Sequence, residues 1–255
     1  MYGKRKSNSR KYSRGEPYKA RKVYVPRTVI KFGDQVVHRF RRYLPDITFF
    51  GAGSGAMSYS NVDGLPVNFL TMGGTLSEVA SAPGLVMFPI ALDVRLNSII
   101  SPTEITDLFQ QYRIRKCTVR FSVDSSNTWT VDAANMANTI PSIIMAADPN
   151  DATTPSTAAT LLKFGDVKIA ELRDNMKPVY FSYYPKPSVG LFAGVVSTGY
   201  AAPNSNKDLW LDTSSPSADI PHYALKAMFR NVNPNTPGLC IRMYTCIEID
   251  VRTTR

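Results

Sequence analysis

Lysines and arginines dominate the first 31 residues, where Ser, Gly and Tyr separate them. These cations are Lys4, Arg5, Lys6, Arg10, Lys11, Arg14, Lys19, Arg21, Lys22, Arg27 and Lys31. Such a segment binds phosphate groups by releasing the counterions of a polyanion, without sequence preference and with steep salt dependence. The segment therefore predicts nucleic-acid binding.

Four tyrosines, Tyr2, Tyr12, Tyr18 and Tyr24, are spaced through the same segment. A tyrosine ring that stacks on an unpaired base contributes about 1 to 3 kcal/mol, although chance composition explains their presence equally well. A block rich in Lys and Arg is also typical of a nuclear import signal. One segment can serve both roles.

The basic character continues into two later segments that are predicted as strands. Arg39, Arg41 and Arg42 lie in the first, and Arg113, Arg115, Lys116 and Arg120 lie in the second. If these strands are neighbours, the sheet has a cationic face beneath the basic segment. An ordinary solvated polar face fits the same pattern equally well.

Residues for catalysis or metal binding are few. The only histidines, His38 and His222, each fall within a predicted strand and are interpreted as structural. No phosphate-binding loop, nucleophile turn or metalloprotease pair occurs. Cys240 and Cys246 share a strand face without a second pair at zinc spacing. The sequence therefore predicts no enzyme, no metal and no cofactor.

The net charge of +10 over 255 residues comes from one end of the chain. Residues 1–42 hold 14 lysines and arginines against Glu16 and Asp34, a net charge of +12. The remaining residues hold 16 lysines and arginines against 18 aspartates and glutamates, a net charge of −2. A charge block of this kind indicates a tail for a polyanion. Cys117, Cys240 and Cys246 are interpreted as buried free thiols, because they form no disulfide framework.

No secretory signal and no membrane insertion are expected. The first 22 residues lack an apolar stretch, and the longest apolar run, near Leu85–Leu92, is interrupted by Pro89. That run is far shorter than the roughly 20 residues of a membrane helix.

The rest of the chain is predicted to be all-β. Residues 1–35 form a disordered basic arm, and residues 36–255 form one domain of short strands between turn residues. Eight strands in one domain predict an antiparallel jelly roll of two packed sheets. The expected strands are Val36–Phe50, Leu85–Ile99, Tyr112–Val123, Ile140–Ala146, Pro178–Tyr184, Leu209–Asp212, Tyr223–Val232 and Leu239–Arg252.

Finer features are also predicted. The apolar phase of Tyr112–Val123 changes near Lys116, which indicates a bulge or bend there. Ser101 begins a capping box with Pro102 at the first helical position, and a second short helix is expected after Thr154-Pro155. Long polar loops are expected at Gly51–Pro66 and Gly73–Gly84, among others.

Several short patches resemble circovirus-like capsid proteins. Tyr112-Arg113-Ile114-Arg115-Lys116 is similar to the start of strand D in that family. The later patches follow in the same order as in that family. They are Tyr180-Phe181 with Pro185-Lys186-Pro187, then Leu209-Trp210-Leu211, and then the last two strands, which are joined through Asn231–Gly238. The resemblance covers roughly residues 36–252.

The resemblance implies a jelly roll with strands B to I in sheets BIDG and CHEF. It implies a T=1 icosahedral shell of sixty copies around circular single-stranded DNA, hence a virion component that also enters the host nucleus during assembly. The expected partners are the genome, other copies of the chain, nuclear import receptors and, through outward loops, a host cell-surface receptor.

Two other readings stay open at this point. A coat protein of a small RNA virus fits the same pattern, because phosphate contacts do not distinguish RNA from DNA. A cellular nucleic-acid-binding β-barrel with a basic tail would stay monomeric. A jelly-roll enzyme would need a cluster of His and carboxylate ligands, which the two isolated histidines do not supply.

Overall fold

A computed structural model describes residues 29–32, 35–53, 55–61, 64–77, 85–125, 140–172, 177–193, 196–201, 209–214, 217–234 and 239–253. Residues 1–28, which contain ten of the eleven cations of the predicted arm, lie outside the described residues. So do residues 78–84 and 126–139, which belong to the predicted loops Gly73–Gly84 and Asp124–Thr139.

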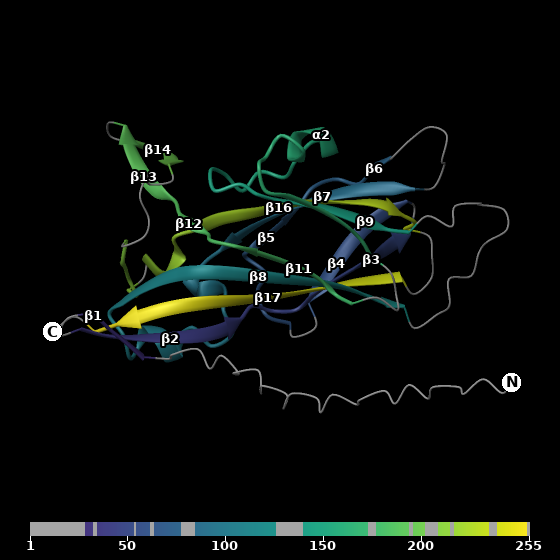
Figure 1. Cartoon of the computed structure of the whole chain (residues 1–255). Coiled ribbons are helices and arrows are strands. Elements are labelled where there is room, and N and C mark those ends of the chain that lie inside the picture. The colour runs from purple at the N-terminus through teal and green to yellow at the C-terminus, as the bar shows by residue number, and fades with distance from the viewer. Residues whose placement is uncertain are drawn as a thin grey trace, which may run out of the picture.

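Eight strands build two antiparallel sheets that pack face to face (Figure 1). They are β2 (Gln35–Tyr43), β7 (Val86–Val94), β8 (Gln111–Ser125), β9 (Ser142–Ala147), β10 (Val167–Glu171), β11 (Val179–Tyr183), β16 (His222–Val232) and β17 (Leu239–Arg252). We call the sheet β2-β17-β8-β11 the β17 sheet and the sheet β7-β16-β9-β10 the β16 sheet. Lettered B to I in chain order, these strands give BIDG and CHEF, as predicted.

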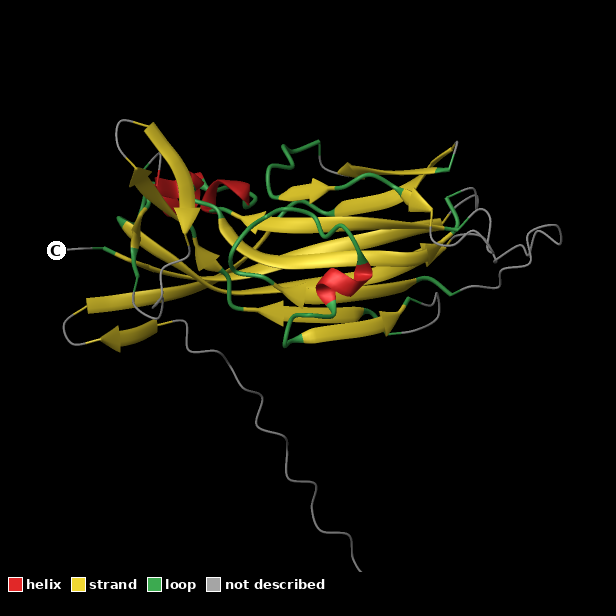
Figure 2. Cartoon of the chain, turned by 90° about the horizontal axis from the view of Figure 1, so that it is seen from above, coloured by secondary structure: helices red, strands yellow, loops and turns green. Residues whose placement is uncertain are grey.

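Shorter strands extend both sheets. β1 (Val29–Phe32), β3 (Ile47–Gly53), β4 (Ala56–Asn61) and β15 (Leu211–Asp212) join the β17 sheet, whereas β5 (Leu70–Met72), β6 (Leu76–Ser77) and β12 (Lys186–Pro187) join the β16 sheet. β13 (Val189–Ala193) and β14 (Val196–Ala201) form a separate hairpin. Seen from above, the long strands run in nearly the same direction, as in an aligned sandwich (Figure 2).

Alternating burial explains why these segments are strands. In β17, Ile241, Met243 and Ile247 are buried, and Arg242 between them is exposed. Side chains of a strand point alternately to its two faces, so one face of β17 lies in the core and the other faces outward.

The predicted bulge is present in β8. Glu248 of β17 pairs with Lys116, but the next residue, Ile249, pairs with Ile114. Arg115 is therefore the extra residue, and the apolar phase of β8 changes there, as the sequence indicated. The extra residue restores burial of the apolar side chains on both sides of it.

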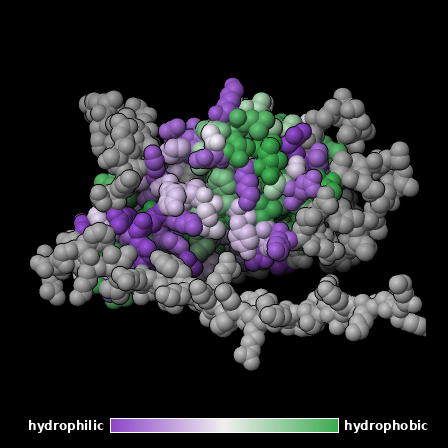
Figure 3. Space-filling model, in the orientation of Figure 1, coloured by the Kyte–Doolittle hydropathy of each residue, from purple (hydrophilic) through white to green (hydrophobic). Residues whose placement is uncertain are grey.

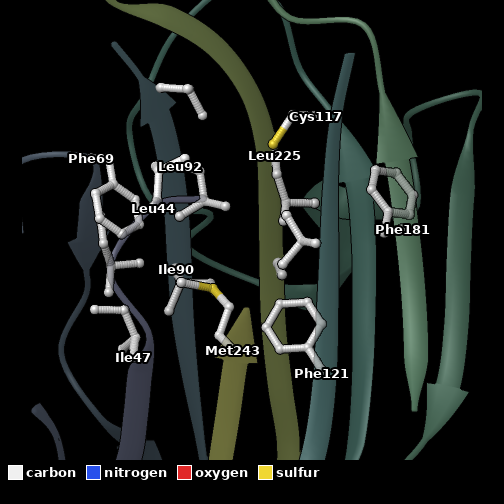
Figure 4. Packing of buried hydrophobic residues seen from close by; sticks show 14 of the residues in the cluster. Leu44, Ile47, Phe69, Ile90, Leu92, Cys117, Phe121, Phe181, Leu225 and Met243 are labelled. Atoms are coloured by element: carbon white, nitrogen blue, oxygen red, sulfur yellow. The ribbon is translucent and has the colours of Figure 1, made fainter. Parts of the chain in front are cut away.

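The core lies between the inner faces of the two sheets (Figure 4). Ile90, Leu92 and Leu225 of the β16 sheet meet Phe121 and Met243 of the β17 sheet. The rings of Phe88 and Phe229 are stacked with their centroids 4.5 Å apart. Such aromatic pairs stabilise a core beyond the area that they bury.

Several predicted elements are corrected by the structure. The arm that was predicted to be disordered to residue 35 contains strand β1, which pairs with β2. Only Leu211 and Asp212 of the predicted strand Leu209–Asp212 form a strand, and β10, which was not predicted, is one of the eight main strands instead. Val36–Phe50 is not one strand, because the chain leaves β2 after Tyr43 and enters β3 at Ile47. The predicted loop Gly51–Pro66 contains most of the hairpin β3-β4, with Gly55 at a φ of 77° in its turn. Glycine accepts this left-handed conformation without strain, so a glycine-rich segment formed a hairpin rather than a loop.

The helices are short, as expected, but one cap differs. Helix α1 (Thr103–Thr106) has Pro102 at its N-cap position and no side-chain cap, so the predicted capping box at Ser101 is wrong. Ser101 instead adopts a φ of 58° and precedes the N-cap residue. Helix α2 (Ala158–Leu161) follows Thr154-Pro155 as predicted, and the Thr157 hydroxyl accepts a hydrogen bond from the backbone N–H of Thr160. Two 3-10 turns, η1 (Leu96–Ser98) and η2 (Ser217–Asp219), complete the helical elements of the described residues.

A second, smaller apolar cluster lies on the outer face of the β16 sheet. There, Leu161 of α2 packs on Ile144 and Met228. On the same face Lys226 is buried and its ammonium group contacts Asp148 at 2.8 Å and Asp151 at 2.5 Å. These ion pairs fasten the segment between β9 and α2 to the sheet.

Candidate nucleic-acid interface

The outward face of the β17 sheet carries a concentration of positive charge. Its described cations on β2, β8 and β17 are Arg39, Arg41, Arg113, Arg115, Lys116, Arg120, Arg242 and Arg252. Among the side chains described at the outward positions of these three strands, the carboxylates are Glu248 and Asp250. Asp124 of β8 occupies a further outward position opposite Cys240, but its side chain is not described. We call this surface the basic face, and Figure 3 shows hydrophilic side chains gathered where β2, β8 and β17 lie together in Figure 1.

Strand register places these side chains in rows across the sheet. Arg113 of β8, Asp250 of β17 and Arg39 of β2 form one row, because each is the direct partner of the next. Lys116, Glu248 and Arg41 form the neighbouring row by the same pairing. Directly opposed side chains of antiparallel strands are close enough to interact.

Asp250 is the centre of the first row and is fully buried. Its Oδ1 accepts a hydrogen bond from Arg39 Nε at 2.7 Å, and its Oδ2 accepts one from Arg113 Nη2 at 3.0 Å. Arg115 Nη1 lies 3.6 Å from the same Oδ2, because the bulge turns this residue towards Asp250. One carboxylate therefore holds three guanidinium groups together, with an excess of positive charge.

Trp210 lies against the same end of the basic face. The guanidinium carbons of Arg113 and Arg252 lie 4.7 Å and 4.2 Å from the centre of its ring. Arg252 also donates from Nε to Gln111 Oε1 at 2.7 Å. Partial burial and the nearby charge of Arg113 both lower the pKa of Arg252. Crowded cations of this kind are stabilised by an anion such as phosphate.

The predicted cations do not all reach this face. Arg39, Arg41, Arg113, Arg115, Lys116 and Arg120 do, although β2 and β8 are separated by β17 rather than adjacent. Arg42 points the other way, where Nη2 contacts Glu104 of α1 at 3.1 Å. Ten predicted cations, Lys4, Arg5, Lys6, Arg10, Lys11, Arg14, Lys19, Arg21, Lys22 and Arg27, lie outside the described residues, and the side chain of Lys31 in β1 is not described.

Sequence reasoning missed five residues of this face: Arg242, Asp250, Arg252, Trp210 and Tyr244. In the sequence of the last strand, Arg242, Tyr244, Asp250 and Arg252 alternate with apolar residues, and this alternation predicts that they share one polar face. The missing information was that this strand lies between the two arginine-rich ones. Nothing local in the sequence indicated that Trp210 would lie against it.

The chain enters the domain beside this face. β1 pairs with β2 from Val29–His38 to Phe32–Gln35, at the edge of the β17 sheet. The segment that precedes Val29 therefore begins at the sheet that carries the basic face.

The histidines and cysteines contribute no described site. His222 is buried, its Nδ1 lies 3.0 Å from the carbonyl oxygen of Ile220, and burial lowers its pKa to about 4. His38 packs on the rings of Phe40 and Phe109. All three cysteines are free, but only Cys117 is buried, since Cys240 and Cys246 are half-buried on the outward face. The prediction of three buried thiols was wrong for the last two, because their strand positions face away from the core.

No group of metal-ligating side chains occurs among the described residues. Within the same residues, no helix has the length and apolar character needed to cross a membrane.

Comparisons with known proteins identify a family from the sequence and a fold from the structure. A family model described as circovirus capsid protein matches residues 66–251. The crystal structure of a 60-mer BFDV capsid protein shares 13% identity with a TM-score of 0.53, over 87% of this chain and 96% of that one. The crystal structure of a decameric BFDV capsid protein shares 12% identity with a TM-score of 0.49, over 85% of this chain and 99% of that one. The structure of Cocksfoot mottle virus shares 10% identity with a TM-score of 0.43, over 87% of this chain and 97% of that one. No curated protein matches the sequence. The first of these structures confirms the predicted jelly-roll fold.

Proposed function

The chain belongs to the circovirus capsid protein family and is a viral capsid protein, and from this premise we propose that it encloses circular single-stranded DNA in a T=1 icosahedral shell of sixty copies. The jelly roll supplies the contacts between copies. The basic arm and the basic face bind the genome, and the arm also directs the protein to the host nucleus before assembly.

The observation that carries this proposal is the placement of positive charge. Val29, the first described residue, lies at the edge of the β17 sheet, and the side chains described on the outward face of β2, β8 and β17 comprise eight cations and two carboxylates. If this face lines the inside of the shell, arm and face meet the genome together. Sixty copies of residues 1–42, each with a net charge of +12, bring about 720 positive charges to the genome.

The test compares the full chain with a variant that lacks residues 2–28. This deletion retains β1, whose pairing with β2 a longer deletion would remove. Electron microscopy should show uniform closed particles of the full chain. The ratio of their absorbance at the nucleic-acid and protein maxima should show that they contain nucleic acid. After the particles are disrupted, deoxyribonuclease should degrade this nucleic acid and ribonuclease should not. The deletion variant should lose most of this nucleic acid.

Two arm variants sharpen the comparison. A shuffled arm of unchanged composition should package as the full chain does, because phosphate contacts have no sequence preference. An arm with its ten cations before Val29 replaced by glutamine should behave as the deletion does. Nucleic acid retained by the glutamine variant would exclude the packaging role of the arm, and a soluble monomer that never closes into particles would exclude the shell. Packaged RNA would favour the RNA-virus alternative.

An apolar edge offers a surface for contact between copies. β10 is at the edge of the β16 sheet among the described strands, and its Ile169 is 62% exposed. Leu162, just after α2, is also exposed, and Figure 3 shows hydrophobic side chains near the position of α2 in Figure 1. An edge strand with exposed apolar side chains readily pairs with another chain.

We expect Ile169→Asp to abolish closed particles while the subunit still folds, because a buried unpaired carboxylate opposes association and an exposed one does not oppose folding. Particle yield by size-exclusion chromatography and electron microscopy measures the effect, and Ile169→Val serves as the control that keeps the apolar contact. If Ile169→Asp forms normal particles, this edge does not take part in contacts between copies.

A further inference from the structure

Three aromatic and cationic side chains form a row across the basic face, away from the Asp250 cluster. Tyr180 of β11 pairs with Arg120 of β8, and Arg120 pairs with Tyr244 of β17. We call these three residues the tyrosine row. Tyr244 and Asp250 are six residues apart on β17, which corresponds to about 20 Å at roughly 3.3 Å per residue.

Arg120 differs from the arginines that Asp250 holds. Its guanidinium carbon lies 5.1 Å from the centre of the Tyr244 ring, so the ring supports it from one side. Its Nε is buried and has no hydrogen-bond partner, and no ion pair of Arg120 occurs among the described residues. A buried donor without a partner is costly, and no carboxylate neutralises this guanidinium among the described residues, so a phosphate bound to its accessible part would supply the missing counter-charge.

Tyr180 presents an accessible ring beside this guanidinium. Its side chain is 51% exposed although it lies within a strand. Its strand is paired with β8, and its backbone carbonyl oxygen accepts a hydrogen bond from Lys168 Nζ. An exposed aromatic ring on a paired strand, opposite a cation, has the chemistry of a stacking position for a nucleobase.

We propose that the tyrosine row binds one unpaired nucleotide, whose base stacks on Tyr180 and whose phosphate contacts Arg120, so that the basic face prefers single strands to duplex. The inference rests on the proposed function, because it requires nucleic acid at this face. A base in a duplex is already stacked and paired, and its ring face cannot reach Tyr180. The remaining cations of the face contact phosphates and hold single strands and duplexes alike.

The test measures binding of the full chain to an oligothymidine and to a duplex of the same length over a series of salt concentrations. Tyr180→Ala should weaken oligothymidine binding about five-fold or more at every salt concentration, without changing the salt dependence or duplex binding. Tyr180→Phe should bind as the unchanged protein does. Arg120→Gln should reduce the slope of log K against log salt by about 0.7 for the single strand, because one phosphate contact is lost.

A matched control tests whether the effect is specific to Tyr180 or common to any exposed tyrosine. Tyr184 is 73% exposed and lies just beyond the end of β11, outside the row. Tyr184→Ala should leave both affinities unchanged. A second readout, photocrosslinking of a bromodeoxyuridine oligonucleotide to the full chain, should place the crosslink on the peptide that contains Tyr180, and Tyr180→Ala should remove it.

The outcomes distinguish this inference from the proposed function. Equal oligothymidine binding by Tyr180→Ala and the unchanged protein, with particles and packaging intact, would overturn the nucleotide site alone. An equal loss in Tyr184→Ala would overturn it as well. Absence of both particles and nucleic-acid binding in the unchanged chain would overturn the proposed function itself.

Discussion

Replacing Asp250 with asparagine is expected to lower the free energy of unfolding of the subunit by about 3 kcal/mol. Asp250 is fully buried and binds Arg39 and Arg113, whose side chains are themselves largely buried. Asparagine keeps the volume but removes the negative charge, and its amide group directs hydrogens at guanidinium donors. The carboxylate that lies between the guanidinium groups of Arg39, Arg113 and Arg115 would then be lost, and the repulsion among these groups would increase. Urea denaturation of the dissociated subunit measures the loss.

The control for Asp250 lies two residues away on the same face. Glu248 also contacts an arginine, at 2.9 Å from Arg41 Nη2, but the Arg41 side chain is 60% exposed. Solvent screens an exposed pair, so Glu248→Gln should change the free energy of unfolding by less than about 1 kcal/mol. Equal effects of the two variants would show that burial of Asp250 does not determine its contribution.

The Asp250→Asn variant also tests the role of the basic face. If phosphate groups bind there, they can replace the missing carboxylate as partners of Arg39 and Arg113. A single-stranded oligonucleotide should therefore raise the melting temperature of Asp250→Asn by more than it raises that of the unchanged protein. Equal increases would indicate that nucleic acid binds elsewhere.

Replacing Lys226 with methionine is expected to lower the free energy of unfolding by about 3 to 5 kcal/mol. The ammonium group of Lys226 is buried on the outer face of the β16 sheet, in contact with Asp148 and Asp151. Methionine has a similar length but no charge, so the buried Asp148 would lose its counter-ion. Lys163→Met, which changes an exposed lysine near α2, is the matched control and should have little effect.

The double variant Lys226→Met with Asp148→Ala tests the cause of this loss. If an unpaired buried carboxylate is responsible, removal of both partners should recover part of the stability that the single change loses. No recovery would mean that the lost packing of the lysine side chain, rather than its charge, explains the effect.

The contribution of Lys226 also predicts a pH dependence. Burial opposes the charged form of Lys226, but Asp148 and Asp151 together raise its pKa. Burial likewise raises the pKa of Asp151, but hydrogen bonds from Lys226 and Thr153 outweigh it and leave the pKa below its ordinary value of 3.8. A carboxyl group with a depressed pKa stabilises the fold above its ordinary pKa, and this stabilisation is lost as pH falls through the depressed value.

The difference in free energy of unfolding between the unchanged protein and Lys226→Met should therefore be constant near neutral pH. It should shrink when the pH falls below about 4, because the pair with Asp151 is lost in the unchanged protein. Urea denaturation at a series of pH values measures this difference. A difference that grows on acidification would contradict the role of the ion pair.

Much of the fold follows from local patterns in the sequence. Alternation of apolar and polar residues in Leu239–Arg252 identified the last strand and its outward face, and the change of phase near Lys116 identified the bulge that the register confirms. These features were predictable because side chains of a strand alternate in direction, so burial leaves a period of two in the sequence. The positive charge of the arm was equally visible, since it depends on composition alone.

Other features depended on which strands become neighbours. Asp250 appeared in the sequence as an ordinary polar position, and it became the centre of an arginine cluster because β17 lies between β2 and β8, which are separated by many residues along the chain. The tyrosine row combines side chains from three strands in the same way. Arg42 appeared equivalent to Arg41, yet its strand position directs it towards Glu104 instead.

The sequence by itself therefore determined which residues alternate, where the charge lies and what class of fold can bury the apolar positions. Tertiary structure alone decided which outward side chains share a row, which carboxylate is buried among arginines and which arginine keeps a donor without a partner. The physical reason is that alternation is a local property of one strand. Pairing between distant strands depends instead on how the whole core closes.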